Sequence, residues 1–181
     1  MGLSLESMAI AMPVVNGHPN RAGFRGGLTI VDAASDKAPS GARGHRVLLT
    51  RRAAEAAIPS LLGMGLDYSP ALDRHDARRK IGVITHAEIV GRFIEIGGFL
   101  YARDFPEIVA EIGKGDGPWE SADRSVRAKR AGLGMSYEIA DALVEDIKAS
   151  VWVLNRVTFT GAAVLRRDKA AYRSTWIELS K

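Results

Sequence analysis

The chain has 181 residues, of which 46% are hydrophobic and 25% charged, so one soluble domain with a single core accounts for it. It contains no cysteine, which excludes disulfides, thiolate metal sites and a cysteine nucleophile. Its four histidines have no metal-ligand spacing, and no apolar run approaches the roughly 20 residues of a membrane span. We therefore expect a globular domain over 1–181 without metal, cofactor or membrane contact.

The first third of the chain carries few functional signals. Gly26 to Asp32 has the short, apolar and β-branched pattern of a strand, and 33–44 has loop composition. Thr50 is placed to cap a helix over Arg51 to Leu62, whose apolar residues follow helical spacing. Residues 1–60 are expected to be a less ordered arm, peripheral strands or an integral strand.

Extended segments dominate the rest of the chain. Ile81 to Val90 and Phe93 to Tyr101 predict a hairpin about Gly91-Arg92, and Phe105 to Ile112 predicts a short helix. Residues 113–130 have the composition of a flexible loop.

Leu133 to Ile139 predicts a strand, 140–149 is ambiguous, and Val151 to Leu165 predicts a strand interrupted at Gly161. A turn over Asp168 to Tyr172 and a strand over Ser174 to Leu179 end the chain. The expected fold is α+β and β-rich: a small, mostly antiparallel barrel or sheet surrounded by helices.

Ser136 and His75 are the candidate catalytic residues. A serine nucleophile needs a base within hydrogen-bond reach and donors for the oxyanion, and glycines beside Ser136 would let a substrate backbone approach. An imidazole can exchange a proton near neutral pH, so His75 is the base that the sequence offers. A plain strand serine and a surface histidine are the alternative interpretations of the same residues.

Four motifs resemble those of tailed-phage prohead maturation proteases, distant relatives of the herpesvirus assemblins. The likeness covers roughly residues 65–175. The motifs occur in this order: His-Asp before Ile-Gly-Val-Ile (75–84), Gly-x-Leu-Tyr-Ala-x-Asp-Phe-Pro (98–106), Leu-Gly-Met-Ser-Tyr-Glu (133–138) and Phe-Thr-Gly-Ala-Ala-Val-Leu-x-x-Asp-Lys-Ala-Ala-Tyr (159–172).

The resemblance implies an assemblin-like β-barrel in which Ser136 is the nucleophile and His75 the base. It also implies a serine endopeptidase that processes phage scaffold and capsid proteins in the immature head. The expected partners are therefore capsid and scaffold proteins or further copies of this chain, and the expected location is the procapsid or virion in the host cytoplasm. Scattered basic clusters leave nucleic-acid contact as a weak alternative.

The third catalytic position departs from the family pattern. The family places an acid or a histidine some 20 to 25 residues after the serine, and here that stretch (156–161) has neither. Glu138, two residues from Ser136 and hence on the same strand face, could take that role. Asn155 and Thr158 are weaker orienters for the imidazole. The pair Arg166-Arg167 resembles the arginines of the assemblin oxyanion site.

Because residues 156–161 offer neither an acid nor a histidine as the third catalytic residue, a non-enzymatic alternative also fits the sequence. In that alternative, a protease-like fold serves as a scaffold, decoration or minor capsid protein. A generic esterase or peptidase unrelated to virions is a third hypothesis.

Overall fold

A computed structural model describes residues 8–114 and 132–180. These residues form a nine-stranded, mostly antiparallel sheet with two short α-helices and two 3₁₀ turns. The elements in chain order are β1 (Met8–Ala9), β2 (Ala22–Ile30), η1 (Ser40–Ala42), β3 (Arg46–Leu49), α1 (Arg51–Ala57), η2 (Ile58–Leu61), β4 (Gly65–Asp67), β5 (Lys80–Val90), β6 (Phe93–Leu100), α2 (Pro106–Gly113), β7 (Leu133–Val144), β8 (Val151–Arg166) and β9 (Trp176–Leu179).

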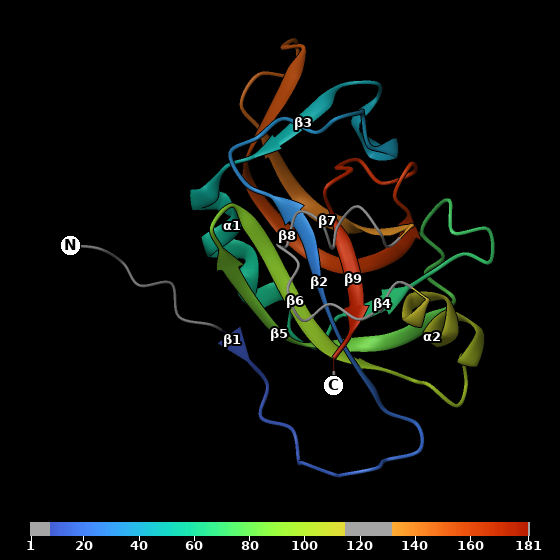
Figure 1. The fold of residues 1–181 in the computed structure, drawn as a ribbon. Helices are drawn as coiled ribbons and strands as arrows, with labels where there is room; N and C mark the ends of the chain where they lie inside the picture. The colour runs from blue at the N-terminus through green and yellow to red at the C-terminus, as the bar shows by residue number, and fades with distance from the viewer. Residues whose placement is uncertain (1–7, 115–131, 181) are drawn as a thin grey trace.

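The sheet has the strand order β3-β8-β4-β5-β6-β2-β9, with β7 paired to β8 and β1 to β5. β8 is its longest strand and pairs in parallel with both β3 and β4. The sheet curls, so that the start of β7 meets β2 and β9 (Figure 1). The Met135 amide donates to Thr175 Oγ1 at 3.0 Å, and a Cβ on Gly26 would lie 2.5 Å from Met135 Sδ. A side chain larger than glycine at position 26 would therefore push the two ends of the sheet apart.

The β-rich prediction is confirmed, and so is the hairpin of β5 and β6, which turns at Gly91 with φ of +61°. The helices beside the sheet are fewer and shorter than expected in the described residues, where α1 and α2 have seven and eight residues. β8 also runs without a break through Gly161, where a local shift of its pairing with β7 replaces the expected interruption. The predicted loop at 113–130 lies almost wholly outside the described residues.

Residues 22–57 contribute the strands β2 and β3 and the helix α1, and all three bury side chains in the core. β2 lies between β6 and β9, and its Phe24 and Leu28 are buried. The core is closed by apolar side chains from β3, β4, β5, β6 and β8, among them Leu49, Leu66, Ile81, Ile84, Ile94, Ile96 and Phe159. Within the described residues no helix is long and apolar enough to cross a membrane.

Thr50 caps α1 as the sequence predicts, because its Oγ1 accepts a hydrogen bond from the Ala53 amide at 3.2 Å. Its hydroxyl also donates to the Leu154 carbonyl of β8 at 3.3 Å. We expect Thr50→Ala to lower the free energy of unfolding by about 1 kcal/mol. Thr50→Ser keeps the hydroxyl and should lose much less in a denaturant titration. Equal losses in the two variants would show that the methyl group, not the cap, stabilises the helix.

Candidate active site

Ser136 and Glu138 lie on the outward face of β7, because side chains alternate along a strand. Met135 is buried on the inward face, and Tyr137 packs edge-on against Phe159 with ring centroids 5.6 Å apart. Burial raises the pKa of the Tyr137 hydroxyl. The sequence around Ser136 therefore fixes which side chains face the core and which face solvent.

The strand register places an aspartate in the same row as Ser136. Asp67 on β4 pairs with Ala163 on β8, and Ala163 pairs with Ser136 on β7. Because neighbouring strands lie about 4.8 Å apart, the Cα atoms of Asp67 and Ser136 are roughly 10 Å apart across β8. The β8 residue between them is only an alanine, which leaves room above the sheet for a third side chain.

His75 occupies that room. It belongs to the loop of residues 68–79 between β4 and β5. The loop is held at three points: Ser69 Oγ donates to Asp73 Oδ1 at 2.8 Å, the Asp76 amide donates to Asp67 Oδ1 at 3.0 Å, and the Arg166 amide donates to the Leu72 carbonyl at 2.7 Å.

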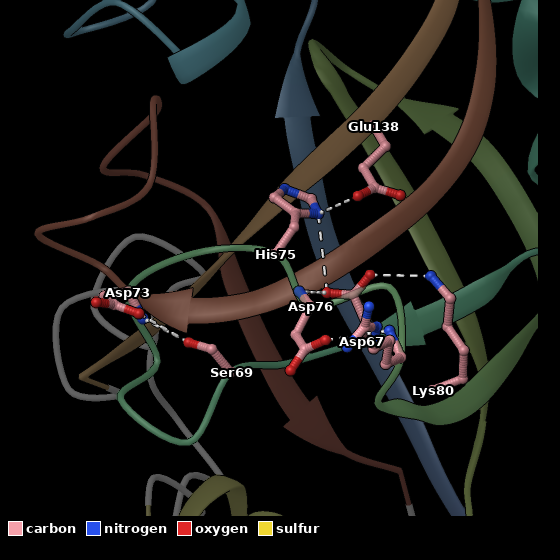
Figure 2. Close-up of polar contacts among 8 residues, drawn as sticks. Asp67, Ser69, Asp73, His75, Asp76, Lys80 and Glu138 are labelled. Atoms are coloured by element: carbon pink, nitrogen blue, oxygen red, sulfur yellow. Dashed lines mark hydrogen bonds and ion pairs between the residues drawn. The ribbon is translucent and has the colours of Figure 1, made fainter.

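The His75 imidazole lies between two carboxylates. Its Nδ1 is 3.2 Å from Glu138 Oε1 and 3.8 Å from Asp67 Oδ1 (Figure 2). These carboxylates belong to β7 and β4, so the ring bridges the two strands that flank β8. Nδ1 is buried, and neither of its two contacts with the carboxylates has the geometry of a hydrogen bond. Figure 2 shows the other ring nitrogen pointing away from both carboxylates.

Asp67 is wholly buried and is paired with a cation. Lys80 Nζ lies 3.0 Å from Asp67 Oδ2, and the two residues are cross-strand partners on β4 and β5. Burial alone would raise the pKa of Asp67, but its contacts with His75, Lys80 and the Asp76 amide outweigh burial and hold that pKa below its ordinary value. Asp67 is therefore ionised at neutral pH and can stabilise a positive charge on the imidazole.

One cleft of about 1040 Å³ is lined by Ser136, His75 and Glu138 together. In the part of the chain that the structure describes, no hydrogen bond joins the Ser136 hydroxyl to His75. Catalytic hydrogen bonds are often long before substrate binds, so this does not exclude the pair. The two candidate residues expected from the sequence, and Glu138 with them, thus line one cleft.

Comparisons with known proteins give likenesses of structure. No protein-family profile and no curated protein sequence matches this chain. The structure is similar to the crystal structure of KSHV protease in complex with a hexapeptide phosphonate inhibitor, with a TM-score of 0.47 and 10% sequence identity. The match covers 88% of this chain and 65% of that protease, so this chain spans less than two thirds of the length of the viral enzyme.

Two carboxylates lie beside His75: Glu138, which the sequence offered for the third position, and Asp67, which it did not. Asp67 precedes His75 by eight residues, whereas the expected third residue follows the serine in sequence. Asn155 is exposed and its amide donates to Glu145 Oε2 at 3.2 Å, and Thr158 pairs across the strands with Ala140. The only sequence signal for Asp67 was a carboxylate at the start of an extended segment.

The two arginines after β8 have different environments. Arg166 is exposed and its Nε lies 3.2 Å from Asp168 Oδ1. Arg167 Nε and Nη2 are buried without a hydrogen-bond partner among the described residues, and burial lowers the pKa of this guanidinium. Neither arginine lines the cleft that contains Ser136.

The same cluster contains metal-ligand atoms. Donor atoms of Asp67, His75 and Glu138 lie within 4.8 Å of one another, an arrangement that the spacing of these residues in the sequence does not reveal. The ammonium group of Lys80 already neutralises Asp67 at 3.0 Å and would repel a cation bound there. The geometry therefore fits an imidazole held by carboxylates better than it fits a resident metal ion.

Gly161 makes the contact between Glu138 and His75 possible. A Cβ at this position would lie 2.9 Å from Glu138 Oε2 and 3.6 Å from Lys80 Nζ. We expect Gly161→Ala to displace the Glu138 side chain from His75 while it leaves Asp67 in place. The measurement is the chemical shift of the His75 ring protons in NMR spectra of wild type and G161A at one pH. Unchanged shifts would show that the methyl group at position 161 does not move the Glu138 side chain.

Proposed function

We propose that this chain is a serine endopeptidase of the phage prohead maturation type, which cuts scaffold and capsid proteins in the immature head. The observation that carries the proposal is the position of His75. Its Nδ1 is flanked by Asp67 and Glu138, while its other nitrogen is free to accept a proton in the cleft that Ser136 also lines. The order of the four sequence motifs supports the same reaction.

In the proposed mechanism Ser136 Oγ attacks the carbonyl carbon of the scissile peptide as His75 Nε2 takes its proton. The imidazolium that forms is stabilised by the two carboxylates at Nδ1. His75 then gives the proton to the departing amine, which leaves an acyl ester on Ser136. Water, activated by the same imidazole, hydrolyses this ester and regenerates the serine. Backbone amides near Ser136 are proposed to bind the oxyanion.

A serine-directed fluorophosphonate tests the nucleophile without knowledge of the substrate. We expect one adduct on Ser136, and none in His75→Ala. Ser150→Ala is a matched control, because Ser150 is exposed and does not line the cleft.

The substrate is tested by co-expression with the phage capsid and scaffold proteins, where cleavage should occur with the wild-type chain and not with Ser136→Ala. Unchanged cleavage in Ser136→Ala would refute the assignment.

The alternative function is that of an inactive, protease-like scaffold, decoration or minor capsid protein. The observation that favours it is the lack of a hydrogen bond between Ser136 and His75 in the described residues. Copy number in mature particles separates the two proposals: a protease acts in the procapsid and is lost on maturation, whereas a structural protein persists in many ordered copies.

A further inference from the structure

The cleft that contains Ser136 has two ends of opposite character. One end is polar and presents Asp73, His75, Ser136 and Glu138. The other is apolar and is formed by Val47, Val144, Trp152 and Leu154. A continuous cleft with a reactive end and an apolar end fits a ligand that is long and binds through side chains as well as at the reacting bond.

The strand register builds the apolar end. Val47 on β3 pairs with Trp152 on β8, and Leu154 on β8 pairs with Val144 on β7. β3 thus brings Val47 to the other three side chains, although it precedes them by about 100 residues in the sequence. The loop of residues 37–42 lines the same cleft and forms a second wall.

Trp152 is held in place before any ligand binds. Its indole N–H donates to the Ile147 carbonyl at 3.1 Å, and its ring stacks on His45 with centroids 4.6 Å apart. A fixed aromatic ring provides apolar contact area at a low entropic cost. The wall is therefore suited to receive a side chain and does not need to be rearranged.

The separation of the two ends gives the size of the ligand. Ala142 and Val144 follow Ser136 by six and eight residues on β7. A regular strand of this length would span about 20 to 26 Å, which is an upper limit because Asp141 is left-handed and the pairing of β7 shifts here. An extended peptide of roughly six or seven residues covers that length. In addition, β7 pairs only with β8 among the described residues, so beyond Met135 its other edge can hydrogen-bond an added strand.

We propose that the apolar end, defined by Val47, Val144, Trp152 and Leu154, is a subsite for an aliphatic side chain of an extended peptide substrate. The side chain lies about five to seven residues from the bond cut at Ser136. This inference rests on the proposed endopeptidase function, because the cleft continues directly to Ser136 and His75. Specificity would then depend on a residue remote from the reacting bond as well as on its neighbours.

Two adjacent residues of β7 provide a matched test. Ala142 and Leu143 are both exposed, but only Ala142 lines the cleft. Ala142→Glu places a carboxylate at the apolar end, and Leu143→Glu places the same charge on a position that does not line the cleft. Neither substitution touches the core or the catalytic residues, so both variants should fold with the stability of wild type.

The probe is a library of blocked ten-residue random peptides incubated with the Ser136→Ala chain, which cannot cleave them. We expect bound peptides to be enriched in Leu, Ile, Val or Met at one position. The dissociation constant of the best single peptide should rise about ten-fold in S136A/A142E, and it should change little in S136A/L143E. Binding should also change Trp152 fluorescence, measured in a Trp119→Phe, Trp176→Phe background.

The outcomes separate the inference from the function. If wild type cleaves peptides but shows no preference for an aliphatic residue five to seven positions from the cut, the subsite inference is wrong and the endopeptidase function is supported. Alternatively, peptides show the aliphatic preference, and lose it with A142E, while wild type never cleaves them. In that case the apolar end is a peptide-binding site and the proposed endopeptidase function is wrong. An equal rise of the peptide dissociation constant in S136A/A142E and S136A/L143E overturns the inference. A dimer that is abolished by A142E alone would make a second copy of this chain the occupant and would also overturn it.

Discussion

Replacing Ser136 with alanine should lower kcat for a cleaved peptide by at least about 10⁴-fold. The acyl intermediate cannot form without the hydroxyl, and only binding and oxyanion contacts remain to accelerate attack by water. KM should change little, because the side chain removed is small and does not bind the remote parts of the substrate. Single-turnover cleavage of a labelled peptide, with comparison of S136A and wild type, measures the effect.

His75→Ala provides the second arm of this test. Residues that act as one unit give non-additive losses, so the double variant S136A/H75A should be no slower than S136A alone. Ser150→Ala should keep wild-type activity. If the losses of the two single variants instead multiply in the double variant, Ser136 and His75 act independently, and the assignment of nucleophile and base is wrong.

Asp67→Asn should be the most damaging conservative change outside the serine and the histidine. Asparagine keeps the shape of the side chain but removes the negative charge that stabilises the imidazolium, so we expect kcat to fall by about 10³-fold. Glu138→Gln should cost less, because Glu138 is partly exposed to water and Asp67 remains in place. A larger loss in E138Q than in D67N would reverse the roles of the two carboxylates.

The same aspartate should also affect stability. Removing it leaves the Lys80 ammonium without its partner, and we expect D67N to lower the free energy of unfolding by about 1 to 3 kcal/mol. The estimate is at the low end for a buried pair because the Lys80 side chain is 38% exposed. The double variant D67N/K80M should recover part of this loss, and K80M alone should leave the buried carboxylate uncompensated.

The pH dependence of stability follows from the direction of the Asp67 pKa. The pKa is lower in the folded state than its ordinary value of 3.8, so the ionised form is stabilised by folding. That stabilisation is fully present above about pH 4 and is lost as the pH falls through the lower folded-state pKa. Urea titrations should therefore show a steeper acid limb for wild type than for D67N. Parallel acid limbs would show that the carboxylate is not stabilised by its partners.

The sequence by itself determined the local structure on which the site is built. Alternation along residues 133–139 placed Ser136 and Glu138 on one face of a strand, and that strand is β7. Thr50 and the Gly91 turn fixed a helix start and a hairpin, because capping and turn conformations depend on adjacent residues. The motif order named Ser136 and His75, which the structure places in one cleft.

Only the tertiary structure revealed Asp67, the second carboxylate beside His75. The loop of residues 68–79 brings His75 back to Asp67, and the Asp76 amide donates to Asp67 Oδ1 at 3.0 Å. The parallel pairing of Asp67 on β4 with Ala163 on β8, 96 positions apart, places Asp67 in the same row as Ser136. Such pairing depends on how the whole sheet curls, and local patterns carry no information about it. The parallel pairing of β3 with β8 places Val47 beside Trp152 at the far end of the cleft. The strand around Ser136 and the candidate carboxylate Glu138 were readable from their own residues, but Asp67 was not, because sheet register is a property of the complete fold.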